Sequence, residues 1–319
     1  MNRKSAILTI WFISGLFLIL LLLWTMDVSF SQLITSLSVV PWWTYLIVGF
    51  LTAGNQVVGA LKWRTARGWL APRSKKPSMV DMVESTSVGS FFGQLVPPQI
   101  STAIARWVIA EPDERRDGAV LGSTLFEQLF DLPVLLAAGL AGMTAIALGL
   151  GAGMSLAVLC ATLIASVGLL RHVLGGLRIA ITAITGTLAL QRTQDSFRDG
   201  FLRAEAAPAS VTFKLSLLSV IRLLIVGSRA VIVTMIFAPA AAPMVIVAGY
   251  PIIGLVTALP ITPAGLGVVE WTWSGILIQA GATAESAVIA ALGLRLINLV
   301  ALSTILMVFV GLRLLRRGK

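Results

Sequence analysis

The sequence has little of three things that most soluble enzymes use, namely charge, cysteine and histidine. Only 12% of its 319 residues are charged and 57% are hydrophobic, whereas an average globular domain has about 25% charged residues. Its one cysteine, Cys160, excludes a disulfide framework and a cysteine-based metal cluster. Its one histidine, His172, excludes a multi-histidine metal site. The composition therefore excludes a soluble enzyme, a disordered protein and a coiled coil.

The charge that is present is mostly positive. There are 24 Lys and Arg residues against 14 Asp and Glu residues, a formal net charge of +10. Such an excess often indicates a nucleic-acid partner, but the high apolar content favours a membrane instead. We also find no catalytic triad, metal-ligand cluster or phosphate-binding loop, so we expect neither a cofactor nor a bound metal.

Long apolar runs dominate what remains. A membrane-spanning helix needs about 20 mostly apolar residues. The first run follows Asn2-Arg3-Lys4 as a signal peptide would, but it is too long for a signal sequence and no small-residue cleavage site follows, so we expect it to be retained. The second begins after Pro41 and ends at Lys62 and Arg64. We predict an all-α membrane protein with six full spans, at residues 6–25, 42–61, 118–140, 154–170, 215–237 and 287–312.

Two further apolar stretches, residues 79–110 and 244–280, fit poorly as full spans because prolines and glycines interrupt them. Proline removes a helical hydrogen bond and clashes with the preceding turn. Non-helical backbone is tolerated at membrane depth only when protein surrounds it or it lines a cavity. We therefore predict two re-entrant helical hairpins. Their tip residues are Pro97 and Pro98 in the first, and Pro260, Pro263, Gly265 and Gly267 in the second, where Pro251 is a further interruption.

The distribution of basic residues predicts the orientation. Lys and Arg gather at both termini, in the loop after the second span, at the end of the first hairpin and between the fourth and fifth spans, whereas the opposite loops contain none. Because short cytoplasmic loops are enriched in Lys and Arg, we predict that both termini are cytoplasmic and that neither hairpin crosses. The two hairpins then enter from opposite faces, as in an inverted repeat. Residues 176–204 carry arginines beside apolar residues at helical spacing, which predicts a cytoplasmic surface helix or a solvated linker.

Ionisable side chains within the apolar stretches are the candidate functional groups, because burying charge in a bilayer is unfavourable and usually serves a purpose. Glu127 and Asp131 share one face of a helix, as do Arg222 and Arg229. Two readings stay open: these groups pair only with one another and hold the bundle together, or they line a polar cavity whose arginines bind a phosphate. Arg222 is predicted near the cytoplasmic end of its span, where it could reach the interface. The candidate substrate-binding residues are Gln94, Arg106, Glu127, Asp131, Arg222, Arg229, Glu270, Arg295 and Asn298.

Four motifs together resemble a known family. They are Trp63-Arg64 after the second span, the Gly93–Pro98 tip with Arg106, the Glu127-x-x-x-Asp131 helix, and the run from Pro263 to Glu270, Pro-Ala-Gly-Leu-Gly-x-x-Glu. This set resembles the flippase-like membrane domain of lysylphosphatidylglycerol synthases over nearly the whole chain. The resemblance implies movement of lipids between leaflets or a role in polyprenyl-linked sugar pathways.

The sequence departs from that family in two ways. It lacks the soluble aminoacyl-transferase domain, so lipid aminoacylation is not implied. Its first tip reads Pro97-Pro98-Gln99 where relatives tend to have Pro-Gly or Gly-Gly, which leaves the headgroup preference open.

We therefore expect a single integral membrane domain over residues 1–319 that translocates a phospholipid or polyprenyl-phosphate lipid, is not an enzyme and binds no nucleic acid. The cytoplasmic membrane of a prokaryote is its expected location. A second hypothesis is an accessory subunit of a membrane-bound synthase or glycosyltransferase. A third is an intramembrane transferase acting on a polyprenyl phosphate, for which the acidic candidates are Asp81, Glu84, Glu111 and Asp113.

Overall fold

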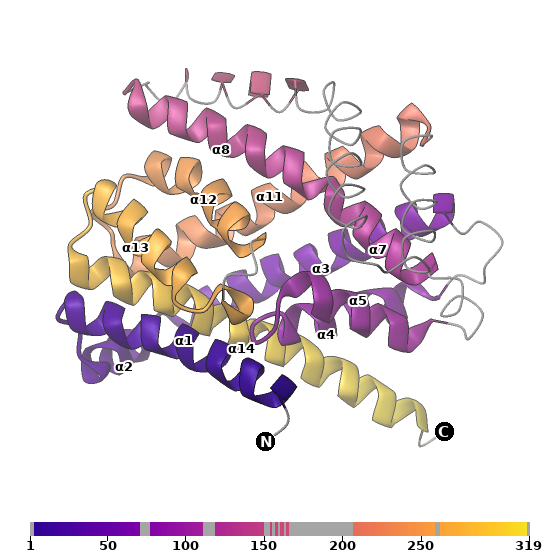
Figure 1. The fold of residues 1–319 in the computed structure, drawn as a ribbon, viewed down its shortest axis with the longest axis horizontal. Coiled ribbons are helices and arrows are strands. Elements are labelled where there is room, and N and C mark those ends of the chain that lie inside the picture. Colours follow the sequence, from indigo (N-terminus) through magenta and orange to yellow (C-terminus); the bar gives the residue numbers. More distant parts are fainter. Residues whose placement is uncertain are drawn as a thin grey trace.

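The computed structural model describes residues 3–70, 77–110, 119–149, 207–258 and 262–317, with residues 154, 157–158, 160–162 and 164–165. Every regular element in these ranges is a helix and none is a strand, so the all-α prediction is confirmed (Figure 1). The predicted surface helix at 176–204 lies outside the described residues, as do most of the predicted span 154–170 and the residues Pro260, Glu111 and Asp113.

Four helices among the described residues are long and apolar enough to cross a membrane. They are α3 (Trp42–Leu70), the Gly122–Ala145 stretch of α7 and α8, α11 (Ala209–Phe237) and α14 (Ala284–Arg317). A fifth crossing is formed if α1 (Arg3–Thr25) and α2 (Phe30–Ser38), which are bent by 89° at the break between them, make one span. The protein is therefore an integral membrane protein, with four to five candidate spans in the described part of the chain. The sixth predicted span, 154–170, lies mostly outside that part.

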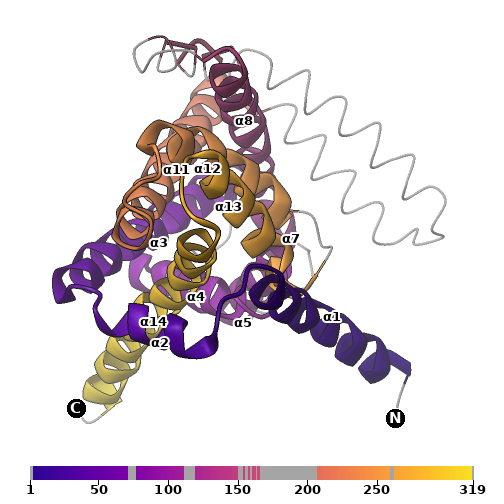
Figure 2. The same ribbon diagram turned by 90° about the vertical axis from the view of Figure 1, so that its left-hand side faces the viewer.

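Helices α3, α11 and α14 form the centre of the bundle, and the other helices pack around them (Figures 1 and 2). Val48, Val233 and Ile297, one from each of the three, are buried together in one cluster. Helix association in a bilayer depends on such close packing, because lipid chains are as apolar as the side chains. These three helices also carry most of the polar groups described below.

Helix α3 continues beyond its predicted end. The prediction ended the span at Leu61 and placed Lys62 and Arg67 in a cytoplasmic loop, but the helix runs to Leu70 and both side chains are buried. The prediction was wrong because a basic residue ends a span only when it has no partner in the protein. Lys62 has one, Asp131.

The predicted helix at 118–140 is divided. Helix α7 (Ala119–Leu129) ends before Phe130, and α8 (Asp131–Ala147) begins after it. Pro133 accounts for the break, because it has no N–H to donate to Leu129 and its ring crowds that carbonyl. Glu127 and Asp131 therefore lie on opposite sides of a break, and their side chains have different partners.

Helices α4 (Met79–Phe92) and α5 (Pro98–Ile109) form an antiparallel hairpin at the first predicted tip. Helix α5 begins at Pro98, where a missing N–H does no harm. The two helices approach closely at Gly89, where an added Cβ would lie 2.6 Å from the Cα of Thr102. With 14 and 12 residues, they are about 21 and 18 Å long, less than the roughly 30 Å of a hydrocarbon core.

The second predicted hairpin consists of α12 (Pro243–Ala258), the short 3₁₀ turn η1 (Pro263–Gly265) and α13 (Val268–Gln279). The amide of Ala242 donates to the carbonyl of Ala280 at 2.8 Å, which joins the two ends of the hairpin. The predicted interruption at Pro251 is wrong, since α12 continues through this residue. Contacts of α12 with α8 and α13 support it there, as neighbouring helices commonly do for proline in membrane proteins.

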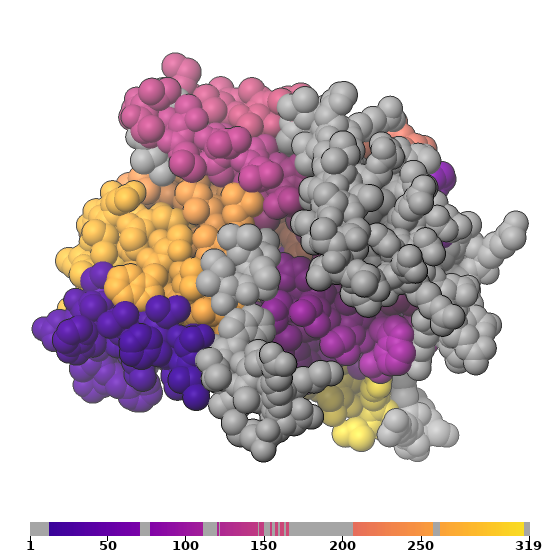
Figure 3. All heavy atoms as spheres, viewed as in Figure 1, coloured from indigo at the N-terminus to yellow at the C-terminus, as the bar shows by residue number. Residues whose placement is uncertain are grey.

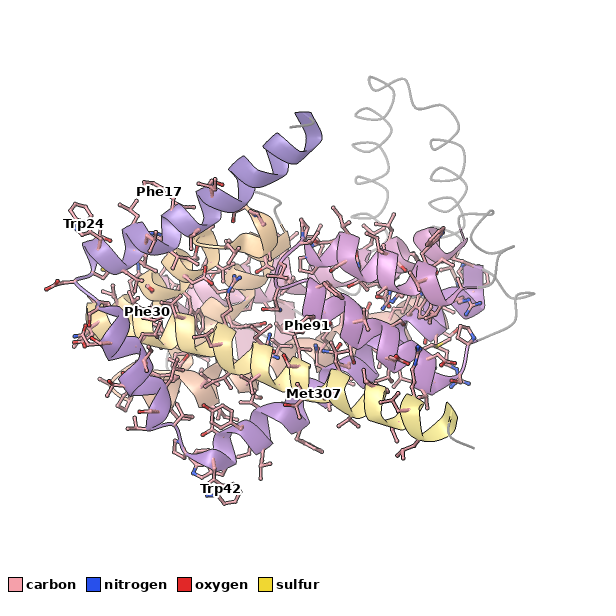
Figure 4. All side chains as sticks on the ribbon, turned by 90° about the horizontal axis from the view of Figure 1, so that it is seen from below. Phe17, Trp24, Phe30, Trp42, Phe91 and Met307 are labelled. Carbon is pink, nitrogen blue, oxygen red and sulfur yellow. The ribbon has the colours of Figure 1, made fainter. Side chains whose placement is uncertain are left out.

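Large apolar side chains cover the outside of the bundle. Phe17 and Trp24 on α1, Trp42 at the start of α3 and Met307 on α14 are exposed, and Figure 4 shows Phe17, Trp24 and Trp42 pointing away from the bundle. Helix α1 contacts α13 and η1 and extends away from the rest toward its N-terminus (Figure 2). An apolar exterior of this extent suits a protein surrounded by lipid.

Candidate functional site

One face of α3 carries polar side chains through the middle of the bundle. Thr52, Asn55, Gln56 and Lys62 are all buried, and their spacing of three, one and six residues places them on one side of a helix. The Gln56 side-chain oxygen accepts a hydrogen bond from the Ser90 hydroxyl on α4 at 2.9 Å. This polar face meets charged residues of α8 and α11.

Asp131 at the start of α8 is held by two cations. Its Oδ1 lies 2.5 Å from the Lys62 ammonium, and its Oδ2 lies 3.1 Å from Nη1 of Arg222. Arg222 also donates from Nε to the Asn55 side-chain oxygen at 3.2 Å. Lys62 is fully buried, whereas the side chains of Asp131 and Arg222 keep 22% and 34% of their exposure. Arg222 is therefore the accessible cation of the group.

Arg229, two turns further along α11, donates hydrogen bonds only to neutral side chains. Its Nη1 donates to the side-chain oxygen of Asn298 at 2.6 Å and to the hydroxyl of Thr52 at 3.2 Å. No carboxylate of the described residues lies within ion-pair distance of it. Its Nε is buried without a hydrogen-bond partner. We call these residues the central cluster: Thr52, Asn55, Lys62, Asp131, Arg222, Arg229 and Asn298.

The central cluster lies deep along α11. Arg222 follows the first residue of α11 by 13 positions in a helix of 29 residues, which places it about 20 Å along the helix axis. Helix α11 begins at Ala209, six residues before the predicted start of the span, so Arg222 lies further from the helix start than the sequence predicted. A charged group within an apolar helix needs partners in the protein, and Arg222 has them in Asp131 and Asn55.

A second group of charges surrounds Trp63. Arg106 on α5 donates from Nη1 to Oε1 of Glu127 on α7 at 2.7 Å, and both side chains are buried. The Arg106 guanidinium carbon lies 4.8 Å from the centre of the Trp63 ring, and the Trp63 indole N–H donates to the Ser123 hydroxyl at 3.0 Å. We call Trp63, Arg106, Ser123 and Glu127 the Trp63 cluster. It joins α3, α5 and α7, and the buried Arg67 of α3 also lies over the Trp63 ring, 5.6 Å from its centre.

A third group holds the tip of the second hairpin. Glu270 on α13 accepts from the amide of Gly267 at 2.7 Å and pairs with Arg295 on α14 at 2.5 Å. Arg295 also donates to the carbonyl of Ala264 at 3.2 Å. Ala264, Gly265 and Gly267 all have positive φ angles, 52°, 68° and 80°, a region that L-residues other than glycine adopt at a cost. Glu270 and Arg295 thus fix an unusual backbone turn against α14.

The predicted site residues fall into these three groups rather than into one. Arg222, Arg229, Asp131 and Asn298 belong together, whereas Arg106 pairs with Glu127, and Glu270 pairs with Arg295. The Arg106–Glu127 pair is close enough to the central cluster to interact electrostatically with Lys62, Asp131 and Arg222. Gln94 lies at the tip of the first hairpin, where its side-chain nitrogen is 3.5 Å from the carbonyl of Ser90. The sequence did not predict Thr52, Asn55 and Lys62 as site residues. Their signal was polar residues at helical spacing within an apolar run.

Glu84, an acidic candidate for transferase chemistry, lies outside all three groups. It accepts two hydrogen bonds from Arg313 near the end of α14, at 2.9 and 3.1 Å, and Arg313 is more than half exposed. Among the described residues, no group of three or more His, Cys, Asp or Glu side chains could hold a metal ion. The Glu84–Arg313 pair is therefore a partly exposed ion pair at the periphery, unlike the buried pairs within the bundle.

In the space-filling view of Figure 3, a narrow hollow lies between the α12 side of the bundle and the α4–α5 hairpin. The two partly exposed charges of the central cluster are Asp131 on α8 and Arg222 on α11. The arrangement can hold a polar group among apolar helices. Its guanidinium groups offer the paired donors that suit an anion.

Residues 11–305 match the model of the lysylphosphatidylglycerol synthase transmembrane region. The match covers most of the chain, and the protein therefore belongs to this family. A comparison with curated proteins finds no match. The family places the protein among membrane domains related to lipid metabolism.

Proposed function

We propose that this member of the lysylphosphatidylglycerol synthase transmembrane family is a lipid translocase. The phosphate of a phospholipid or polyprenyl-phosphate headgroup enters the central cluster while the acyl or prenyl chains stay in the bilayer. Arg222 and Arg229 bind the phosphate, since a guanidinium offers paired donors that fit its oxygens. The protein itself catalyses no covalent step.

A single observation carries this proposal: the central cluster has partly exposed charge in the middle of apolar helices. A charge at the centre of a bilayer helix is unfavourable by about 2.5–3.5 kcal/mol on insertion scales. The Arg106–Glu127 and Glu270–Arg295 pairs offset that penalty by joining each carboxylate to a guanidinium of the protein. The central cluster has more cations than carboxylates and keeps Arg222 accessible, as a site for a transient anion would.

The two helical hairpins supply the moving parts. We propose that α4–α5 and α12–α13 are re-entrant from opposite faces and form an inverted repeat, because each helix is short for a bilayer and each hairpin turns at proline. Rocking of these hairpins opens the cluster to one leaflet and then the other. Movement is downhill or coupled to an ion gradient, with Asp131 as the accessible carboxylate. Both termini face the cytoplasm of a prokaryote.

The proposal is tested by lipid movement in proteoliposomes. Protein is reconstituted into vesicles with trace phosphatidylglycerol that carries a fluorophore on its acyl chain. A membrane-impermeant quencher is then added outside, and the loss of fluorescence is followed over time. Vesicles with the protein should lose fluorescence from both leaflets, and Arg222→Gln should slow the loss of the inner-leaflet signal. Arg313→Gln, which removes a peripheral arginine paired with Glu84, is the matched control and should behave as wild type.

The accessory hypothesis gives a different result. An accessory subunit would leave the inner-leaflet fluorescence at the level of empty vesicles, for phosphatidylglycerol and for a labelled polyprenyl phosphate alike. Folded, monodisperse protein that moves neither lipid would therefore overturn the translocase proposal. Equal rates for wild type and Arg222→Gln would overturn the role of the central cluster.

A further inference from the structure

Resting on the proposed function, we infer that the translocated lipid has a net negative headgroup and that the central cluster rejects cationic, aminoacylated lipids. Three features support this inference: the balance of charge in the cluster, the partners of every buried carboxylate, and the ease with which two arginines can change partners.

The central cluster has two positive charges that no carboxylate balances. Its charged members are Lys62, Arg222 and Arg229 against Asp131 alone. The Lys62–Asp131 pair is neutral as a whole whether or not a proton passes between the two groups. Two guanidinium groups then remain, and arginine stays protonated under all ordinary conditions. The excess is therefore two positive charges, located on one face of α11.

No buried carboxylate of the described helices is available for an ammonium group. Glu127 and Glu270 are almost fully buried and are paired with Arg106 and Arg295. Asp131 already has two cations. A headgroup with a net positive charge, such as lysine esterified to phosphatidylglycerol, would approach Arg222 and Arg229 without a carboxylate to receive it. Like charges in a medium of low dielectric repel strongly.

An anion can enter with little rearrangement. Arg229 donates only to neutral oxygens, those of Thr52 and Asn298, and a phosphate oxygen is a stronger acceptor for it. Arg222 can leave Asp131, because Lys62 remains within 2.5 Å to balance that carboxylate. Lys62 thus positions Asp131 and releases Arg222. A phosphate diester carries one negative charge and a monoester carries about −1.5 to −2, so both fit the excess.

The test measures binding separately from transport. Purified protein in a neutral detergent is titrated with short-chain phosphatidylglycerol, phosphatidic acid, phosphatidylcholine and lysylphosphatidylglycerol, and with inorganic phosphate, and bound lipid is followed by native mass spectrometry and by the unfolding temperature. We expect phosphatidylglycerol and phosphatidic acid to bind at least about tenfold more tightly than the zwitterionic and cationic lipids. Tighter binding of phosphatidic acid than of phosphatidylglycerol would show that the site prefers a phosphate monoester. Equal binding of the two would show that it accepts monoesters and diesters alike.

Variants locate the preference. Arg229→Gln and Arg222→Gln should each weaken anionic-lipid binding about tenfold, Arg229→Lys should keep the preference for anions with lower affinity, and Arg313→Gln should change nothing. Preference for lysylphosphatidylglycerol, or equal binding of all lipids, would overturn the inference. Inorganic phosphate that competes as well as the lipids would assign the site to a free anion instead. Charge-selective binding without transport would contradict only the translocase proposal, whereas transport of cationic lipid would contradict only this inference.

Discussion

The Trp63 cluster gives a prediction about stability that separates structural charge from functional charge. Arg106 and Glu127 are 2.7 Å apart, and each keeps at most 2% of its exposure. Removing one partner of a buried pair leaves the other without compensation, which typically destabilises by about 3–5 kcal/mol. Arg106→Met should therefore lower the free energy of unfolding by about that amount. It should also remove the stacking of the guanidinium on Trp63, which adds up to roughly 2 kcal/mol in a dry setting.

The double variant makes this prediction specific. Replacing both partners, Arg106→Met with Glu127→Gln, removes both charges, so much of the lost stability should return and the coupling energy should be about 2 kcal/mol or more. The measurement is the unfolding of purified protein in mixed micelles by increasing denaturing detergent. The peripheral pair of Glu84 and Arg313, with Arg313 54% exposed, is the matched control, and Arg313→Gln should change stability by only about 0–1 kcal/mol.

The same experiment can refute the reasoning. If Arg106→Met were no more destabilising than Arg313→Gln, Arg106 would not be part of a buried pair. If the double variant lost as much stability as the sum of the two single variants, the two side chains would act independently. Transport by the folded double variant should remain close to wild type, because the Trp63 cluster does not bind the lipid.

Two further predictions concern the hairpin tip and the lysine of the central cluster. Gly267→Ala places a Cβ at a φ of 80° and against Leu18 on α1, so it should lower the unfolding temperature and weaken the contact of α1 with the tip; unchanged stability would contradict the conformation of the tip. Lys62→Gln leaves Asp131 with Arg222 as its only cation, so Asp131 should hold Arg222 more tightly. If that interaction strengthens by about 1.4 kcal/mol, transport in the proteoliposome assay should slow about tenfold. A rate equal to wild type would exclude the proposed release of Arg222.

Much of the fold was predictable because apolar length and proline are local signals. The apolar runs predicted the positions of α3, α11 and α14, and Pro97-Pro98 predicted the turn between α4 and α5. The bend between α1 and α2 was not predicted, although Ser29 and Gln32 form a capping box at the start of α2. Pro251 was given too much weight, because the support of neighbouring helices is not visible in a sequence.

The site was predictable in residue type but not in pairing. Buried charge in apolar runs pointed to Arg222, Arg229 and Asp131, since such charge is unfavourable wherever the helix goes. Which cation meets which carboxylate depends on helix packing, and therefore Lys62 was assigned to a loop. We therefore propose the anion site at Arg222 and Arg229 instead of at Arg106, because Glu127 already pairs with Arg106.

The most direct test of the central claim is an experimental structure of the protein in nanodiscs made of phosphatidylglycerol. The account predicts a lipid phosphate within about 3 Å of the guanidinium groups of Arg222 or Arg229, with Lys62 still paired to Asp131. The account would be contradicted by a structure in which every lipid headgroup lies at the membrane surface. In that structure Arg222 would bond only to Asp131 and Asn55, and Arg229 only to Thr52 and Asn298.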